Sequence, residues 1–201
     1  MSRKRLLITL ILIWGLLGCA TRPAINQSPT PSVSAKTAPV QAKYYVKRIA
    51  DGDTITVVNA RGVESKIRFA CVDAPEVPHT KEERASYKPV DLDQFKWGRQ
   101  ARNRLTQLLQ QGGNRVSLNL LDSDRYGRKV AEVWLPDKRL VQEILAREGL
   151  AVVYTQFIKN CPDASPVKQA EAEAKQQKVG IWGDRRFVTP SEWRRQNKQK
   201  A

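Results

Sequence analysis

The sequence is poor in the residue that most often performs acid–base and metal chemistry in enzymes. Histidine occurs once in 201 residues, as His79. A metal centre held by several histidines is therefore excluded, and a histidine general base is disfavoured. No internal repeat is evident. The chemistry of this protein must rest on carboxylates and arginines.

Negative charge is also scarce. The chain has 20 Asp and Glu against 35 Lys and Arg, which gives a net charge of +15 and a pI near 10.0. Three of the positive charges belong to a predicted leader, so the mature chain would carry about +12. Such a surplus favours polyanions as partners, namely nucleic acid, anionic lipid or acidic polysaccharide. Charge alone does not separate these three.

The longest apolar run, residues 6–17, is shorter than the roughly 20 residues of a comfortable membrane span. It follows a short basic segment, so we predict a signal peptide over residues 1–18. Its end, Leu-Leu-Gly-Cys, resembles a bacterial lipobox and predicts that Cys19 is lipidated and begins the mature chain. An ordinary cleaved signal or an uncleaved anchor are the alternatives. We therefore expect a lipid-anchored protein of the cell envelope, on the periplasmic side of an outer membrane or on the cell surface.

Residues 19–43 are mostly Pro, Ser, Thr, Ala and Gln, with little that can be buried. Burial of such a segment would not repay the entropy of ordering it. We predict a flexible tether between the lipid anchor and one folded domain, over residues 44–182, followed by a basic tail over 183–201. The length of 201 residues suits a single domain with such appendages.

The predicted domain contains five strand-like segments, which are rich in β-branched residues or alternate apolar with polar ones: 44–50, 54–59, 64–72, 115–121 and 128–135. Three segments have helical periodicity or capping residues: 95–110, 140–148 and 166–178. Residues 150–154 are strand-like or extended, and residues 78–93 read as an exposed insertion. The fold class is α+β, mainly β: a five-stranded OB-type Greek-key barrel with about three helices.

Carboxylates and arginines gather in three short motifs: Asp-Gly-Asp-Thr at 51–54, Arg-Phe-Ala-Cys-Val-Asp-Ala-Pro-Glu at 68–76, and Asp-Arg-Tyr-Gly-Arg at 124–128. Two or three carboxylates and two arginines are what a metal-assisted attack on a phosphodiester needs. Taken singly, Asp53 and Asp73 would as readily be turn residues at strand ends, and Arg68 a solvated strand residue. Asp51 is interpreted as a turn former.

The three motifs, in this order, resemble the staphylococcal nuclease (thermonuclease-like) family. Matching segments are 46–54, 68–76, 124–128, 149–151 and 171–182, nearly all of the predicted domain. The resemblance implies an OB-fold nuclease that hydrolyses DNA and RNA with one calcium ion and leaves 3′-phosphates. Magnesium or manganese could replace calcium, because the carboxylates do not define the size of the cavity.

The resemblance also assigns roles by position. Asp53, Asp73 and the backbone carbonyl of Ala74 are implied as metal ligands. Arg68, Glu76 and Arg128 fall on catalytic positions, where Glu76 would either accept a proton from the attacking water or orient it. The implied nucleotide-binding residues are Tyr126, Tyr154 and Arg125, of which Arg125 is expected to contact phosphate or solvent rather than to act in catalysis.

Two cysteines remain besides Cys19. Cys71 is expected in the middle of a strand and Cys161 in the loop before the last helix. In an exported protein such a pair suggests a disulfide. The alternative is a buried free Cys71 with an unpaired Cys161.

The leading hypothesis is a monomeric, lipid-anchored, calcium-dependent endonuclease that acts on DNA and RNA outside the cytoplasm. The main alternative is a non-catalytic envelope lipoprotein that binds nucleic acid through its OB fold by charge and stacking. A third option is an envelope protein whose basic tail binds acidic lipid or polymer. The full set of Arg68, Glu76 and Arg128 favours the nuclease, because a pure binder has no need of it.

Overall fold

The structure is a computed structural model, and it describes residues 44–198. The predicted signal peptide, Cys19 and the tether lie outside the described residues, so they stay predictions. Within residues 44–198, no helix is both long enough and apolar enough to cross a membrane.

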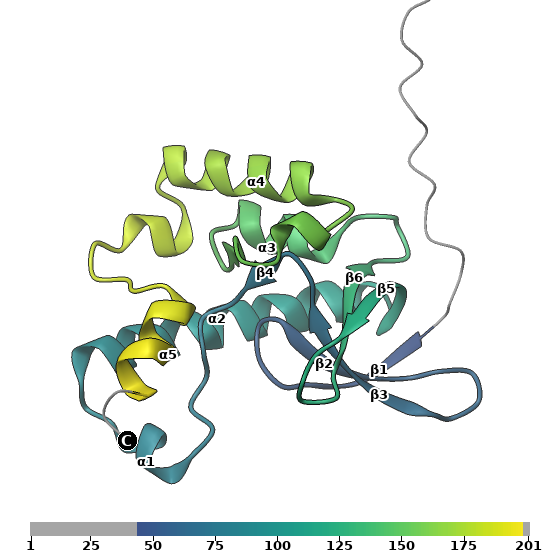
Figure 1. The fold of residues 1–201 in the computed structure, drawn as a ribbon, viewed down its shortest axis with the longest axis horizontal. Helices are drawn as coiled ribbons and strands as arrows, with labels where there is room; N and C mark the ends of the chain where they lie inside the picture. The colour runs from purple at the N-terminus through teal and green to yellow at the C-terminus, as the bar shows by residue number, and fades with distance from the viewer. Residues whose placement is uncertain (1–43, 199–201) are drawn as a thin grey trace, which may run out of the picture. The chain divides into compact units, whose positions relative to one another are not determined.

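The described chain contains a closed five-stranded barrel, which lies at the lower right in Figure 1 with the helices α3 (Val141–Arg147) and α4 (Ala164–Gln177) above it. Its strands are β1 (Tyr44–Ile49), β2 (Thr54–Val58), β3 (Glu64–Phe69), β5 (Arg115–Ser123) and β6 (Lys129–Trp134). The order around the barrel is β1-β2-β3-β6-β5, with β3 and β6 parallel and every other pair antiparallel. The predicted OB-type barrel is confirmed.

Alternation of side chains explains why these segments are strands. In β2, Ile55 and Val57 are fully buried, and β5 buries Val116 and Leu118 in the same two-residue rhythm. Successive side chains of a strand point to opposite faces, so one face of each strand lines the core. The predicted strand bounds agree with the structure to within two residues, except that the third predicted strand, 64–72, already ends at residue 69.

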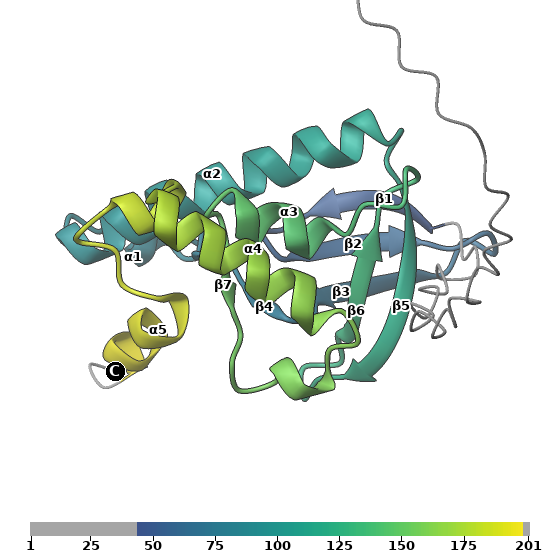
Figure 2. The ribbon, with the colours of Figure 1, turned by 90° about the horizontal axis from the view of Figure 1, so that it is seen from above.

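Helices cover the barrel and extend beyond it. They are α1 (Lys81–Arg84), α2 (Pro89–Gln111), α3 (Val141–Arg147), α4 (Ala164–Gln177) and α5 (Pro190–Lys198). The face of α2 that carries Ala101, Leu105, Leu108 and Leu109 is fully buried, as its periodicity predicts. In Figure 2 the helices α2, α3 and α4 lie beside the strands, while α1 and α5 lie by the N-terminal half of α2.

The segment 78–93, expected to be an exposed insertion, is largely helical. Helix α1 begins after Thr80 with a capping box, and α2 begins at Pro89 rather than at residue 95. Proline is favoured at the first position of a helix because its missing N–H has no partner there. Asp91 and Asp93 are buried, at 5% and 8% exposure. The prediction treated Pro89 as a residue that interrupts a helix, whereas Pro89 is the first residue of α2.

Helix α4 also begins earlier than predicted. Its N-cap is Asp163, and Ser165 and Pro166 lie within its first turn. Its C-cap Lys178 is in the left-handed region, at φ 54°, so the helix ends before Gly180. Helix α3, in contrast, ends as predicted with Gly149 in the left-handed region just beyond it.

The expected location of Cys71 in mid-strand is wrong. Strand β3 ends at Phe69, and Cys71 has a left-handed backbone with φ 69°. The chain then enters β4 (Val72–Asp73), which leaves the barrel and pairs with β7 (Val152–Val153). The predicted disulfide is confirmed: Cys71 and Cys161 are bonded, with their Cα atoms 5.7 Å apart. It ties the turn before Asp73 to the loop before α4.

The residues after 182, predicted as a basic tail, pack on α2 as far as they are described. Trp193 of α5 is only 6% exposed, and its ring meets Phe95 of α2 edge-on at 5.7 Å between centroids. Its indole N–H donates to a carboxylate oxygen of Asp91 at 2.8 Å. This contact brings the C-terminal helix to the side of the fold that carries the site described next.

Candidate active site

Arg68 lies at the centre of a buried cluster of carboxylates. One terminal nitrogen of its guanidinium is 2.8 Å from a carboxylate oxygen of Asp53, and the other is 2.7 Å from one of Asp73. The side chain of Arg68 is 12% exposed, and those of the two aspartates are 7% and 1% exposed. The planar fork of arginine suits this simultaneous contact with two carboxylates. The structure thus brings together three of the residues that the sequence predicts for the site.

The position of Asp53 follows from the register of the barrel. Thr54 pairs with Arg68 across β2 and β3, so Asp53 is the last residue before the strand begins. Its backbone N–H donates to the side chain of Asp51 at 2.9 Å, which confirms Asp51 as a turn former. Gly52 is needed in this turn, because a Cβ there would lie 2.7 Å from the Cβ atoms of Ala74 and Ala101.

Asp73 comes from β4, which the disulfide and β7 hold beside the barrel. The next residue, Ala74, donates its N–H to Asp53 at 2.6 Å. The backbone of Ala74 therefore lies against the carboxylate of Asp53 and follows directly on Asp73. This contact is made by the N–H of Ala74, and the role of its carbonyl as a metal ligand stays a prediction.

Glu76 completes the acidic cluster after the Ala-Pro turn. Its backbone packs on α2 at Gly98, where an added Cβ would lie 1.9 Å from the Glu76 carbonyl oxygen. Its side chain is 20% exposed, and His79 on the following loop is 4.0 Å away. The close approach of helix and turn is possible only because residue 98 has no side chain.

Burial changes the acid–base behaviour of the cluster. It raises the pKa of the Asp53 carboxyl from 3.8 to about 7, and the neighbouring Asp51 and Asp73 add to the effect while Arg68 opposes it. Burial also raises the pKa of Glu76, with a further contribution from Asp53. Such shifts are typical of functional sites, where charged groups are held together out of water.

A further arginine, Arg194 of α5, lies in the cluster, and the sequence-based prediction missed it. One guanidinium nitrogen is 2.7 Å from Asp73 and the other is 2.6 Å from Glu76. The only sequence signal was Trp193, a single large aromatic in an otherwise polar and basic segment, which indicates that part of the tail is anchored.

The donor set fits a hard divalent cation. Two carboxylates and one backbone carbonyl are oxygen ligands, and calcium takes six to eight of these, the remainder from water and substrate. Within residues 44–198, no group of three or more His, Cys, Asp or Glu side chains is arranged to hold a metal ion. The expected site needs only two, Asp53 and Asp73, which face the same guanidinium.

Arg128, Arg125 and Tyr126 lie together on the turn between β5 and β6. Arg128 pairs with Asp124 at 2.7 Å, and Asp124 also accepts the backbone N–H groups of residues 126 and 128. The guanidinium carbons of Arg125 and Arg128 lie 4.9 and 5.7 Å from the centroid of the Tyr126 ring. Tyr126 is 67% exposed. This turn presents two cations and an aromatic ring to solvent.

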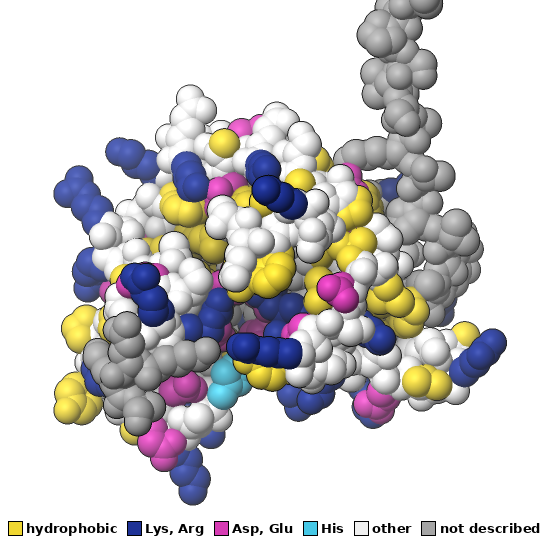
Figure 3. Space-filling view, viewed as in Figure 1, with side chains coloured by type: hydrophobic (Ala, Val, Ile, Leu, Met, Phe, Trp, Pro, Cys, Tyr) yellow, Lys and Arg dark blue, Asp and Glu magenta, His cyan; other side chains and the backbone are white. Residues whose placement is uncertain are grey.

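The same turn lies next to Arg68 in the fold. Arg68 pairs with Val130 across the parallel strands β3 and β6, and Arg128 is two residues before Val130. No contact between Arg128 and the carboxylates of Asp53, Asp73 or Glu76 is found among the described residues. In Figure 3, acidic side chains lie among Lys and Arg side chains near the centre of the face shown.

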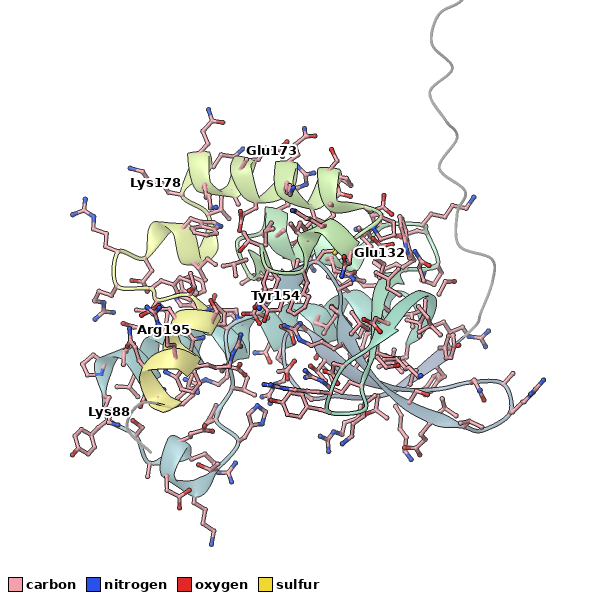
Figure 4. All side chains as sticks on the ribbon, viewed as in Figure 1. Lys88, Glu132, Tyr154, Glu173, Lys178 and Arg195 are labelled. Carbon is pink, nitrogen blue, oxygen red and sulfur yellow. A yellow bond between two sulfur atoms is a disulfide. The ribbon has the colours of Figure 1, made fainter. Side chains whose placement is uncertain are left out.

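Tyr154 directly follows β7, the strand that pairs with β4. Its backbone N–H donates to the carbonyl of Cys71 at 2.8 Å, one residue beyond β7. Its ring packs edge-on against Phe157 at 5.1 Å, and its hydroxyl is 3.3 Å from Gln156. Figure 4 shows Tyr154 near the middle of the molecule. Its predicted role in binding nucleotide stays a prediction.

Comparison with known proteins places these residues in context. Residues 66–184 match the family described as "Staphylococcal nuclease homologue". The chain is 36% identical over 149 residues to an uncharacterized endonuclease of Escherichia coli O157:H7, covering 74% of this chain and 82% of that protein. It is 31% identical over 162 residues to a micrococcal nuclease of Shigella flexneri, covering 76% of this chain and 80% of that protein.

A third relative is an uncharacterized endonuclease of Haemophilus influenzae, 27% identical over 198 residues, which cover 98% of this chain and 88% of that protein. The family match begins after Asp53 and includes Arg68, Asp73, Glu76 and Arg128. It ends at residue 184, before α5 and Arg194.

Proposed function

Because this chain belongs to the staphylococcal nuclease family and is therefore a nuclease, we propose that it is a calcium-dependent endonuclease acting on DNA and RNA outside the cytoplasm and leaving 3′-phosphates. The observation that carries the proposal is the fork of Arg68 across the buried carboxylates of Asp53 and Asp73, with Glu76 in the same cluster through Arg194.

The residues of the cluster divide into ligands and reactive groups. Asp53, Asp73 and the carbonyl of Ala74 would hold the calcium ion, which would act as a Lewis acid towards a phosphoryl oxygen and would orient water. Arg68 lies against these ligands and stays charged at any relevant pH. It is therefore in place to neutralise charge that develops on the oxygens of the scissile phosphate.

We assign proton transfer to Glu76. Burial raises the pKa of Glu76, which makes its carboxylate a better proton acceptor for an attacking water than an ordinary exposed glutamate. Its side chain keeps 20% exposure, so water reaches it. Arg128 would bind the phosphate from the neighbouring turn after releasing Asp124, where Tyr126 and Arg125 offer stacking and charge to the substrate.

Cleavage assays on the purified protein test the proposal. We expect the protein to degrade DNA and RNA in the presence of calcium, and we expect cleavage to stop when a chelator is added. Glu76→Gln and Arg128→Ala should each lower the rate by about a hundredfold or more, because the first removes the proton acceptor and the second removes a positive charge that binds the reacting phosphate.

Two matched variants serve as controls in these assays. Glu82→Gln changes an exposed glutamate on α1. Arg139→Ala removes an arginine that pairs with Asp137 in another turn, just as Arg128 pairs with Asp124. Both controls should keep full activity. Binding of nucleic acid without metal-dependent cleavage would overturn the proposal in favour of the non-catalytic binder.

We also propose that Cys19 carries a lipid that anchors the protein in the cell envelope. Support comes from the sequence alone, in which an apolar segment ends at Leu-Leu-Gly-Cys. A Cys19→Ser variant should change the mobility of the protein on a gel and remove it from the membrane fraction. Unchanged processing and unchanged fractionation would show that this proposal is wrong.

A further inference from the structure

Arg194 occupies the acidic cluster from the far end of the chain. Its guanidinium contacts Asp73 through Nη2 to Oδ2 at 2.7 Å and through Nη1 to Oδ1 at 3.3 Å, and it contacts Glu76 through Nη1 at 2.6 Å. Asp73 is thus held by two guanidinium groups, since Arg68 contacts Oδ1 at 2.7 Å. Nothing in the mechanism proposed above requires this second arginine.

The position of Arg194 is built into the fold by buried residues of α2. Asp91 is 5% exposed and accepts the indole N–H of Trp193, while Phe95 packs against the same ring. Asp93, which is 8% exposed, pairs with Arg186 at 3.0 Å. Three side chains of one helix turn therefore bind the segment that precedes and carries Arg194.

Gln94 connects the same segment to the turn of Glu76. With its amide oriented to satisfy both neighbours, its nitrogen donates to the carbonyl of Val188 at 3.1 Å and its oxygen accepts the N–H of Glu76 at 3.3 Å. Gln94 is 1% exposed. A buried polar side chain with both ends bonded fixes the distance between the groups that it joins.

Arg194 contacts both carboxylate oxygens of Asp73, the oxygens that a cation would need. Arg194 is the hydrogen-bond partner found for Oδ2, and it shares Oδ1 with Arg68. A cation that binds Asp73 through Oδ2 would meet the guanidinium nitrogen that now contacts this oxygen, and the repulsion between the two positive charges at such a distance makes their binding competitive. Arginine does not lose its charge, so a change of protonation cannot relieve the conflict.

We propose that Arg194 is a further residue of the active site, which sets the site's affinity for the divalent cation by competing with that cation for the carboxylate of Asp73. The inference rests on the proposed function, since it takes Asp73 as a ligand of the cation. The side chain of Arg194 is 32% exposed, against 12% for Arg68. Arg194 can therefore swing into solvent or onto substrate phosphate while Trp193 stays packed.

Calorimetric titration with calcium chloride tests the competition without any nuclease assay. If Arg194 occupies Asp73 about 90% of the time, its removal makes the whole population competent, and Arg194→Ala should bind calcium about tenfold more tightly than the wild type. Arg194→Lys keeps a positive charge but loses the fork, so its affinity should lie between the two.

Two more variants separate competition from a general effect on the helix. Arg195 is the next residue of α5, is 69% exposed and pairs with Glu192, so Arg195→Ala should leave the affinity unchanged. Trp193→Ala removes the anchor but leaves the arginine in the chain, and it should also tighten calcium binding. Asp73→Asn should abolish binding, which shows that the titration reports on this site.

The outcomes distinguish this inference from the proposed function. Equal or weaker calcium binding by Arg194→Ala, with Asp73→Asn inactive in the titration, would overturn the competition and leave the metal-dependent nuclease intact. If calcium, magnesium and manganese fail to bind to every variant, the metal-dependent mechanism is wrong, and the competition is wrong with it.

Discussion

At the scale of single residues, Asp53 shows how assembly of the site affects stability. Its carboxylate is buried beside two other carboxylates, Asp51 and Asp73, and burial raises its pKa to about 7. A group whose pKa is higher in the folded state than in the unfolded state stabilises the fold while it is protonated. That contribution to stability is complete at pH values below the pKa of the group in the unfolded state. It is lost as the pH rises through the pKa of the group in the folded state.

We therefore predict that the metal-free protein becomes less stable between pH 4 and pH 7 on account of Asp53. The loss is at most about 1.4 kcal/mol of unfolding free energy per pH unit inside this window. Urea unfolding in a chelator at several pH values measures it, and Asp53→Asn should flatten the curve. A wild-type curve parallel to that of Asp53→Asn would contradict the prediction.

Residues of the site differ in how visible they are in the sequence. Asp53, Arg68, Asp73 and Glu76 lie in short motifs close to strand ends, so local pattern and family resemblance both indicate them. Arg194 reaches the site because the neighbouring Trp193 packs against Phe95, which lies 98 positions earlier in the sequence. Local sequence patterns do not reveal such a long-range contact. The left-handed backbone of Cys71 is equally hidden, because most residues with a positive φ are glycines and Cys71 gives no such signal.

At the scale of secondary structure, α2 connects the barrel to the site. Its C-terminal half packs Leu105 and Leu108 into the core, and its N-terminal half binds α5 through Asp91 and Phe95. The sequence predicts the C-terminal half of α2 because its apolar residues recur with helical spacing. It does not predict the N-terminal half, because charged residues such as Asp91 are expected to be exposed until a partner is known.

The contact between α2 and the turn of Glu76 gives a second prediction. An alanine at residue 98 would place a Cβ 1.9 Å from the Glu76 carbonyl oxygen and 2.7 Å from that of Pro75. Backbone atoms cannot rotate away, so helix and turn must separate. We expect Gly98→Ala to lower the unfolding free energy by about 1–3 kcal/mol and to reduce nuclease activity by displacing Glu76.

The matched control for this variant is Gly112→Ala at the other end of α2. There the added Cβ would lie 3.0 Å from the ring of Pro136 and 3.5 Å from the backbone oxygen of Leu109, which is ordinary van der Waals contact. Urea denaturation and a cleavage assay on both variants separate a general effect on the helix from one at the site. If Gly98→Ala were as stable and as active as Gly112→Ala, the close approach would not matter for function.

At the scale of the whole molecule, one disulfide cross-links the turn that leaves the barrel to the loop before α4. The disulfide between Cys71 and Cys161 closes a loop with a sequence separation of 90 residues. Cross-linking so long a loop restricts the unfolded chain, and the chain-entropy estimate for it is about 4–5 kcal/mol. The sequence favours the pairing, since Cys71 and Cys161 are the two cysteines that remain besides Cys19.

We predict that Cys71→Ala with Cys161→Ala lowers the stability by up to about 4–5 kcal/mol. The measurement is urea unfolding with and without dithiothreitol. The reductant should destabilise the wild type to a similar extent and leave the double variant unchanged. A wild type that unfolds at the same urea concentration in both conditions would show that the bond contributes little.

The seam that closes the barrel is narrow, and it has a mechanical consequence. Strand β1 meets β5 through two residue pairs, at Tyr44 and Tyr45, and these are the first two described residues. On its other side, β1 pairs with β2 through four residue pairs. A force applied at the N-terminal end of β1 would load the β1–β5 pairs one after the other, as in unzipping, instead of shearing them together. We expect the barrel under tension to open first along this seam, while the disulfide holds β4 to the helices.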